Sequence, residues 1–154
     1  MFLEYNYIFE CDDKIADNII ALNNKGYITD FCCQGHDKDI IVEVNQDSGK
    51  VEYKEEKRYI GAYVLFTRST SMDITIRNLG KPKNWNCEKT YDHEFDNVLS
   101  YVIRRHYTEN EIKKYTIDEL VDMSMNELKE WIDELPEIKL PFKYNSGNEI
   151  LRKI

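Results

Sequence analysis

The order of the secondary-structure signals constrains this chain most, because strand patterns come first and helix-start signals come last. Residues 3–11, LEYNYIFEC, alternate polar and apolar side chains as a half-buried strand does. We predict an α+β domain that begins strand–helix–strand, with a mostly antiparallel sheet ahead of a C-terminal helical subdomain. In this single domain, residues 1–91 are expected to be mainly β with one helix, residues 92–136 helical, and residues 137–154 an extended tail.

The first half of the chain predicts one helix among strands. Asp12 or Asp13 begins the helix, whose apolar residues follow helical spacing up to Gly26. Residues 59–67, YIGAYVLFT, are apolar nearly throughout and are typical of a central strand. We also expect strands over 27–33 and 72–78, a hairpin over 39–55 that turns at 46–49, and a loop over 79–86.

The second half predicts helices. Apolar residues within 93–107 recur at helical spacing: Phe95, Val98, Leu99, Val102 and Ile103. Three capping boxes then mark three short helices: Thr108 with Glu111, Thr116 with Glu119, and Ser124 with Glu127. Pro136 is expected to end the last helix, and an extended or loose tail follows.

Composition is that of an ordinary globular domain. The 154 residues, 42% hydrophobic and 32% charged, suffice for one core. The opening MFLEYNYIFECDD has no basic n-region, and the longest apolar run, AYVLF, is far shorter than the ~20 residues of a membrane helix. We expect neither a secretory signal nor a membrane span. The four cysteines lack the spacing of a disulfide framework, which favours free thiols and a cytoplasmic location.

Charge is unevenly distributed along the chain. The net charge of −8 argues against binding of long nucleic acids, since these need many Lys and Arg residues. Residues 57–91 nevertheless hold seven basic and two acidic side chains, whereas residues 109–137 hold ten acidic and three basic ones. The basic middle favours a local site for a small anion, and the acidic helical end is a candidate surface for a protein partner.

The segment KGYITDFCCQGH, residues 25–36, carries the chemistry that stands out. Neighbouring strand residues point to opposite faces, so one of Cys32 and Cys33 should pack inside. We expect Cys33 to be the exposed one, with His36 returning toward it across a turn at Gly35. A thiolate beside an imidazolium is a competent nucleophile, but a buried cysteine pair followed by an ordinary turn fits the same residues. Four zinc ligands can also be assembled from Cys33, His36, Cys87 and His93, although no C-x2-C pair is present.

This segment, with the later YVLF and PKNW, resembles a group of small uncharacterised proteins of Gram-positive bacteria and their phages. In that group G-Y-x-T-x-x-x-C-S-G-H is followed by Y-I-x-F and P-x-x-W. The matching positions, spread over residues 12–90, are Gly26, Tyr27, Thr29, Cys33, Gly35, His36, Tyr63, Phe66, Pro82 and Trp85. Gln34 stands where that pattern has Ser. More distantly, the segment is similar to the wybutosine-synthesis (third enzyme) family of tRNA-modifying proteins, which methylate a guanosine-derived base with S-adenosylmethionine. That activity is not carried over, because too little of the pattern is present.

The resemblance implies a site at the Cys33–His36 loop. Pairing of the strand that ends at Cys33 with the strand 63–66 would bring Arg68, Trp85 and His36 together. We therefore expect a binding module for a small anionic, nucleotide-like ligand, lined by Gly35, His36, Arg68 and Trp85. The alternatives are an enzyme with Cys33 as nucleophile and His36 as base, and a zinc-stabilised protein-interaction domain.

Overall fold

The computed structural model describes residues 3–6, 9–45, 47, 49–67, 79–92, 97–138, 142–145 and 150–153. The elements, in chain order, are β1 (Leu3–Asn6), β2 (Phe9–Asp12), α1 (Asp13–Asn24), β3 (Thr29–Cys33), β4 (His36–Asn45), β5 (Val51–Ile60), β6 (Tyr63–Thr67), β7 (Trp85–Asp92), β8 (Asn97–Arg105), α3 (Glu109–Lys114), α4 (Ile117–Glu134), β9 (Phe142–Asn145) and β10 (Ile150–Lys153). This is an α+β fold. The strand predicted over 72–78 lies outside the described residues.

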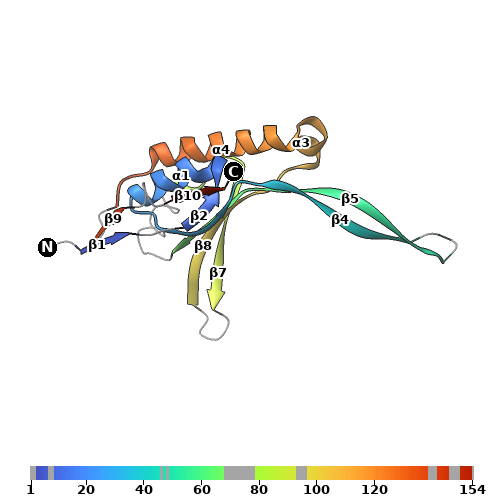
Figure 1. Cartoon of the computed structure of the whole chain (residues 1–154), viewed down its shortest axis with the longest axis horizontal. Helices are drawn as coiled ribbons and strands as arrows, with labels where there is room; N and C mark the ends of the chain where they lie inside the picture. Colours follow the sequence, from blue (N-terminus) through green and yellow to red (C-terminus); the bar gives the residue numbers. More distant parts are fainter. Residues whose placement is uncertain are drawn as a thin grey trace.

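A four-stranded antiparallel sheet, in the order β3-β6-β8-β7, forms the centre of the fold. Helices α1 and α4 lie side by side over one face of it (Figure 1). The apolar stripe of α1 and residues such as Leu128 and Trp131 of α4 pack there against Val64, Phe66 and Ile103 of the sheet. Two short parallel pairs, β1–β9 and β2–β10, connect the N-terminal strands with the C-terminal tail. The predicted pairing of β3 with β6 and the predicted central place of β6 are confirmed, and the tail is extended at Phe142–Asn145 and Ile150–Lys153.

The opposite face of the sheet also carries apolar side chains. Residues alternate along a strand, so Val64 and Ile103 face the helices, while Leu65 and Val102, which pair with each other, face away. Among the described elements, no helix packs over this outer face. The nearly continuous apolar run of β6 therefore reflects two different surroundings, a helix-covered core and an outer surface.

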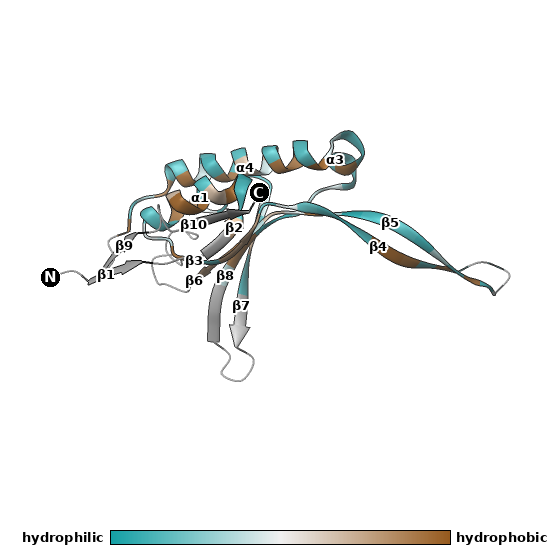
Figure 2. Cartoon of the chain, viewed as in Figure 1, coloured by the Kyte–Doolittle hydropathy of each residue, from teal (hydrophilic) through white to brown (hydrophobic). Residues whose placement is uncertain are grey.

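The hairpin β4–β5 forms a long two-stranded arm that projects from the body of the protein (Figure 1). Its ten residue pairs, from His36↔Ile60 to Asn45↔Val51, exceed the predicted hairpin at both ends. The arm continues the β3–β6 ladder in the same register, because only Gln34–Gly35 and Gly61–Ala62 interrupt the pairing between Cys33↔Tyr63 and His36↔Ile60. Figure 2 shows apolar residues along β4 and polar residues along most of β5.

Two of the three predicted capping boxes are confirmed. Thr108 caps α3 and Thr116 caps α4, and in both cases the Glu three residues later returns a bond to the cap backbone. The third is wrong, because Ser124 lies inside α4, where its hydroxyl donates to the carbonyl of Leu120 at 2.6 Å. Instead of two helices, α4 is one helix of 18 residues that ends before Pro136.

The helix predicted over 93–107 is wrong, because residues Asn97–Arg105 form strand β8. The run is rich in β-branched and aromatic residues, and pairing with β6 and β7 on both sides supplies its hydrogen bonds. Its apolar residues mimic helical spacing because both faces of the strand are apolar: Ile103 belongs to the core under the helices, and Val102, which is also buried, lies on the opposite face. Similarly, the loop expected over 79–86 already enters strand β7 at Trp85, and the helical part begins at Glu109.

Candidate functional site

The Cys33–His36 loop is fixed to the start of α1 by a reciprocal pair of hydrogen bonds. The Gln34 side-chain oxygen accepts the backbone N–H of Lys14 at 2.9 Å, and the Gln34 backbone N–H donates to the Asp12 carboxylate at 3.1 Å. The Asp12 side chain makes no capping bond of its own to α1, so Gln34 satisfies one of the free N–H groups of that helix. The loop is therefore anchored by the residue that replaces Ser in the resembled pattern.

Cys33 and His36 lie together in this loop. The Cys33 Sγ is 3.6 Å from Nδ1 of His36 and accepts the backbone N–H of Gly35 at 3.4 Å. Both neighbours would stabilise negative charge on the sulfur. The expectation that Cys33 is the more exposed cysteine is wrong, because Cys33 is buried with 9% exposure and Cys32 is half-buried. Burial, together with nearby Cys11 and Asp12, raises the pKa of the Cys32 thiol to about 12.

Gly35 is required by the protein's own packing. Its φ of +98° lies in the left-handed region, and a Cβ there would come within 2.7 Å of the Tyr107 hydroxyl. Burial raises the pKa of that hydroxyl, and the neighbouring Ser124 and Arg105 act in the opposite direction. The close approach allowed by Gly35 thus serves Tyr107 and leaves little room for a ligand.

The structure does not bring the other predicted site residues to the loop. Trp85 is fully buried between the sheet and the helices, so no ligand reaches its ring. Arg68 and His93 lie outside the described residues. Cys87 is on β7, separated from Cys33 on β3 by two strands, about 14 Å at the usual strand spacing, which is too far for both thiols to bind one Zn²⁺. Within the described ranges, no group of three or more His, Cys, Asp and Glu side chains is arranged to hold a metal ion.

A hollow on the outer sheet face lies beside the loop. We call it the sheet-face hollow; its volume is about 440 Å³ and its lining residues are Phe31, Tyr63, Leu65, Val102 and Arg104. This volume falls within the range of small-molecule sites. Phe31 lies two residues before Cys33, and Tyr63 pairs with Cys33, so the hollow and the loop share strands β3 and β6.

The charged residue that lines the sheet-face hollow is Arg104. Its guanidinium lies 5.3 Å from the centre of the Tyr63 ring, and its Nε is 3.5 Å from a Glu88 carboxylate oxygen. The Arg104 side chain remains 43% exposed, and Phe31 is 67% exposed. An exposed aromatic ring, a stacked cation and apolar walls are thus gathered on one open surface.

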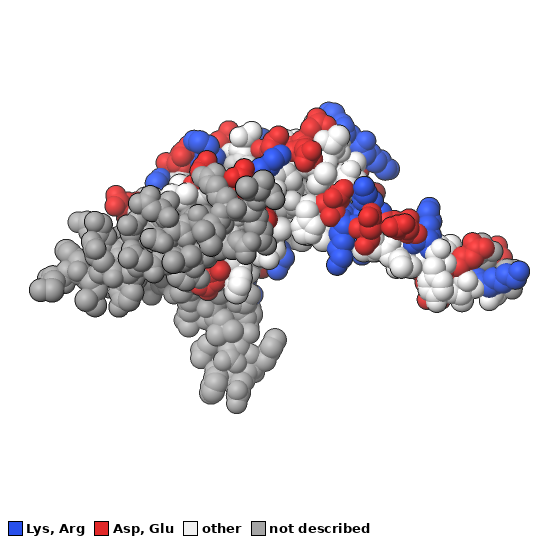
Figure 3. Space-filling view, in the orientation of Figure 1, with Lys and Arg blue, Asp and Glu red and all other residues white. Residues whose placement is uncertain are grey.

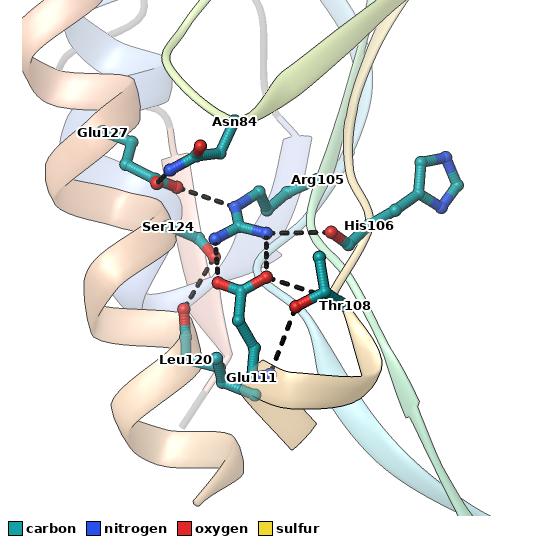
Figure 4. Close-up of polar contacts among 8 residues, drawn as sticks. All are labelled: Asn84, Arg105, His106, Thr108, Glu111, Leu120, Ser124 and Glu127. Carbon is teal, nitrogen blue, oxygen red and sulfur yellow. Dashed lines mark hydrogen bonds and ion pairs between the residues drawn. The ribbon is translucent and has the colours of Figure 1, made fainter. Parts of the chain in front are cut away.

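The adjacent Arg105 points to the opposite face and has a structural role (Figure 4). Its side chain, 1% exposed, pairs bidentately with Glu111 at 3.0 and 2.5 Å and donates from Nε to Glu127 at 2.8 Å. Burial alone would lower the pKa of Arg105, but the bonds to both carboxylates outweigh it and raise that pKa. Hydrogen bonding to Arg105 in turn lowers the pKa of Glu111 from 4.5 to about 2. This ion pair joins the end of β8 to α3 and α4 and leaves Arg105 unavailable to a ligand.

Sequence reasoning did not identify Phe31, Tyr63 or Arg104 as ligand-lining residues. The available signal was that β6 and β8 are apolar on both faces, whereas the helices described in the structure, α1 and α4, pack over one of them. A comparison with protein-family models, with curated proteins and with solved structures finds no match.

Several positions of the resembled G-Y-x-T-x-x-x-C-S-G-H and P-x-x-W patterns have packing roles. A Cβ at Gly26 would lie 2.6 Å from the Ile138 carbonyl oxygen, and Thr29 exchanges hydrogen bonds with Asn23. The Tyr27 hydroxyl donates to the carbonyl of Pro136. These positions account for the fold around the loop and are no evidence for a bound ligand.

No helix among the described residues combines the length and apolar character that a membrane crossing needs.

Proposed function

We propose that this protein is a binding module for a small, flat, anionic molecule of the nucleotide type, held in the sheet-face hollow. The observation that carries the proposal is the arrangement of an exposed Phe31 ring, the Tyr63 ring and the Arg104 guanidinium around one hollow. A planar base stacks on aromatic rings, and a phosphate accepts two parallel hydrogen bonds from a guanidinium. The apolar side chains of Leu65 and Val102 suit the remaining surface of such a ligand.

The charges favour one anionic group over a long polyanion. Arg104 is the cation of the hollow, and Glu88 already partly neutralises it. The chain as a whole carries −8, which opposes binding along an extended phosphate backbone. A ligand with one compact phosphate group could replace Glu88 as the partner of Arg104. The site of this proposal differs from the loop site expected from sequence, because Arg104 and Tyr63 take the roles given there to Arg68 and Trp85.

Calorimetric titration with AMP and ATP tests the proposal. Arg104→Gln should weaken binding about 10- to 100-fold, the usual contribution of a charge-assisted hydrogen bond. Glu88→Gln should strengthen binding, because it frees Arg104, and damage to the fold would not produce that gain. Lys113→Gln removes an exposed cation from α3 and is the matched control. The proposal fails if neither nucleotide binds the unmodified protein, or if the Arg104→Gln variant binds nucleotide as tightly as the unmodified protein.

His36→Ala decides whether the Cys33–His36 loop takes part. His36 is exposed at the root of the arm, where the loop joins strand β4. If the loop contacts the ligand, this variant loses affinity while its unfolding curve stays unchanged. If it binds normally, the site is confined to the sheet face.

A second candidate function is thiol chemistry at Cys33. The 3.6 Å contact with His36 and the N–H of Gly35 favour a thiolate there. Cys33 should then react with iodoacetamide at neutral pH faster than an ordinary cysteine of pKa ~8.5, and His36→Asn should remove that advantage. An unreactive Cys33 in the folded protein excludes this candidate.

A further inference from the structure

Strand β5 of the arm exposes a row of alternating charges. All residues from Val51 to Arg58 of β5 are exposed. Along one face of the strand, Glu52, Lys54, Glu56 and Arg58 alternate in sign, and among the described residues none of these four makes an ion pair. Figure 3 shows acidic and basic side chains interspersed over the arm.

The partner strand β4 does not satisfy these charges. Across the ladder, Lys54 faces Val42 and Glu56 faces Ile40. Arg58 faces Lys38, and like charges directly opposite each other destabilise a sheet. The arm also exposes Tyr53 by 73%, and an isolated two-stranded hairpin is only marginally stable in water. These features all point to a further strand along the free edge of β5.

We propose that two copies of this chain pair through their β5 edges, antiparallel and centred on Glu55, so that the two arms form one four-stranded sheet. In this register Glu52 lies opposite Arg58 of the second copy and Lys54 lies opposite Glu56. Because the two-fold axis repeats each contact, four opposite-charge pairs form. The register also gives Arg58 an acidic neighbour on the side away from Lys38.

The alternation of acidic and basic residues along β5 favours this register over the neighbouring registers. Centring the pair on Glu56 would place Lys54 opposite Arg58, and centring it on Lys54 would place Glu52 opposite Glu56. Each of those shifts creates like-charge pairs and is disfavoured. A shift by a single residue would also exchange the two faces of the strand. The favoured register contains one like-charge contact, between the two copies of Glu55 at the axis.

Sedimentation equilibrium over a range of protein concentrations at low salt measures the pairing. Lys54→Glu and Glu56→Lys should each raise the dimer dissociation constant about tenfold, since each replaces two attractive contacts by two repulsive ones. The double variant restores the opposite charges and should return to within about threefold of the unmodified protein. Glu55→Gln should tighten the dimer by removing the repulsion at the axis.

Lys113→Glu on α3 is the matched control, because it makes the same change of net charge at an exposed residue away from the arm. A chain that stays monomeric at every concentration overturns the proposal, and its edge charges then serve only to prevent strand pairing. A dimer that Lys54→Glu leaves unchanged, or that Lys113→Glu weakens equally, also overturns it.

Cross-linking tests the register separately. In the proposed pairing, Glu55→Cys places the two new thiols directly opposite each other at ladder spacing, which permits a disulfide between copies. Glu56→Cys places each new thiol opposite Lys54 and should not cross-link. Disulfide-linked dimer from the first variant alone supports the register, and equal yields from both contradict it. Nucleotide binding is not needed for either outcome, so this inference stands or fails independently of the proposed function.

Discussion

Replacing Glu111 by Gln should destabilise the protein at neutral pH, because the nearly inaccessible Arg105 guanidinium would lose its bidentate partner. The lowering of the Glu111 pKa from 4.5 to about 2 corresponds to about 3 kcal/mol at ~1.36 kcal/mol per pKa unit. The carboxylate is partly exposed, and Glu127 would still hold Arg105, so we expect a loss of about 2 kcal/mol. Gln retains the bond to the Thr108 backbone, which isolates the ion pair from the helix cap.

Urea denaturation across a pH series measures this loss. A carboxylate whose pKa is lowered by folding contributes stability above its unfolded pKa, and that contribution disappears as the pH falls toward the folded pKa. The difference in unfolding free energy between the unmodified protein and Glu111→Gln should therefore be constant above about pH 5 and shrink between 4.5 and about 2. Glu109→Gln, an exposed neighbour in the same helix, is the control and should change stability by less than about 0.5 kcal/mol. A difference at pH 7 as small as that of the control, or one that persists unchanged to pH 2, would refute the reasoning.

Three further predictions concern the core and the loop. Gly35→Ala should destabilise by more than about 2 kcal/mol in thermal unfolding, since it combines a positive φ with a contact on Tyr107, whereas Gly49→Ala, with nothing within 4 Å, should lose only about 1 kcal/mol. Leu128→Ala, at a fully buried position of α4, should lose about 2–5 kcal/mol in denaturant unfolding, and a loss under 1 kcal/mol would contradict its place in the core. Cys32 should resist iodoacetamide at pH 8 when alkylated peptides are identified by mass spectrometry, and protein stability should fall as the pH rises from 9 toward 12 because the unfolded thiol ionises first. Rapid labelling of Cys32 in the folded protein would contradict its burial.

Local signals in the sequence predicted much of the fold. The capping boxes at Thr108 and Thr116 succeeded because they depend only on residues within one turn. The same pattern at Ser124 failed, because a serine inside a helix can bond to the carbonyl four residues earlier. The helix prediction for the residues of strand β8 failed for a tertiary reason. The apolar residues of this strand face two different surroundings, and their spacing within the strand is the same as that of a helix.

The candidate site was only partly predictable. Contact between Cys33 and His36 follows from a short turn and is visible in the sequence. The sequence predicts Trp85 to be accessible in a loop, because the P-x-x-W pattern does not show that this side chain packs in the core with residues of α4. Arg104 and Arg105 are adjacent in the chain, but one lies in the sheet-face hollow and the other is buried with two carboxylates. Only the pairing of β8 with its neighbours tells these two arginines apart.

The shared register of the arm and the β3–β6 ladder gives the protein a mechanical property. The two parts are one ribbon with a single interruption, held where the Arg105 N–H donates to the Ala62 carbonyl and where a Cβ at Gly61 would overlap the Arg105 carbonyl oxygen. Ten residues of strand extend about 33 Å beyond that point, so a rotation of about 5° there displaces the tip by about 3 Å. A small change in backbone direction at this junction, next to Tyr63 of the sheet-face hollow, would therefore produce a much larger displacement at the tip of the arm.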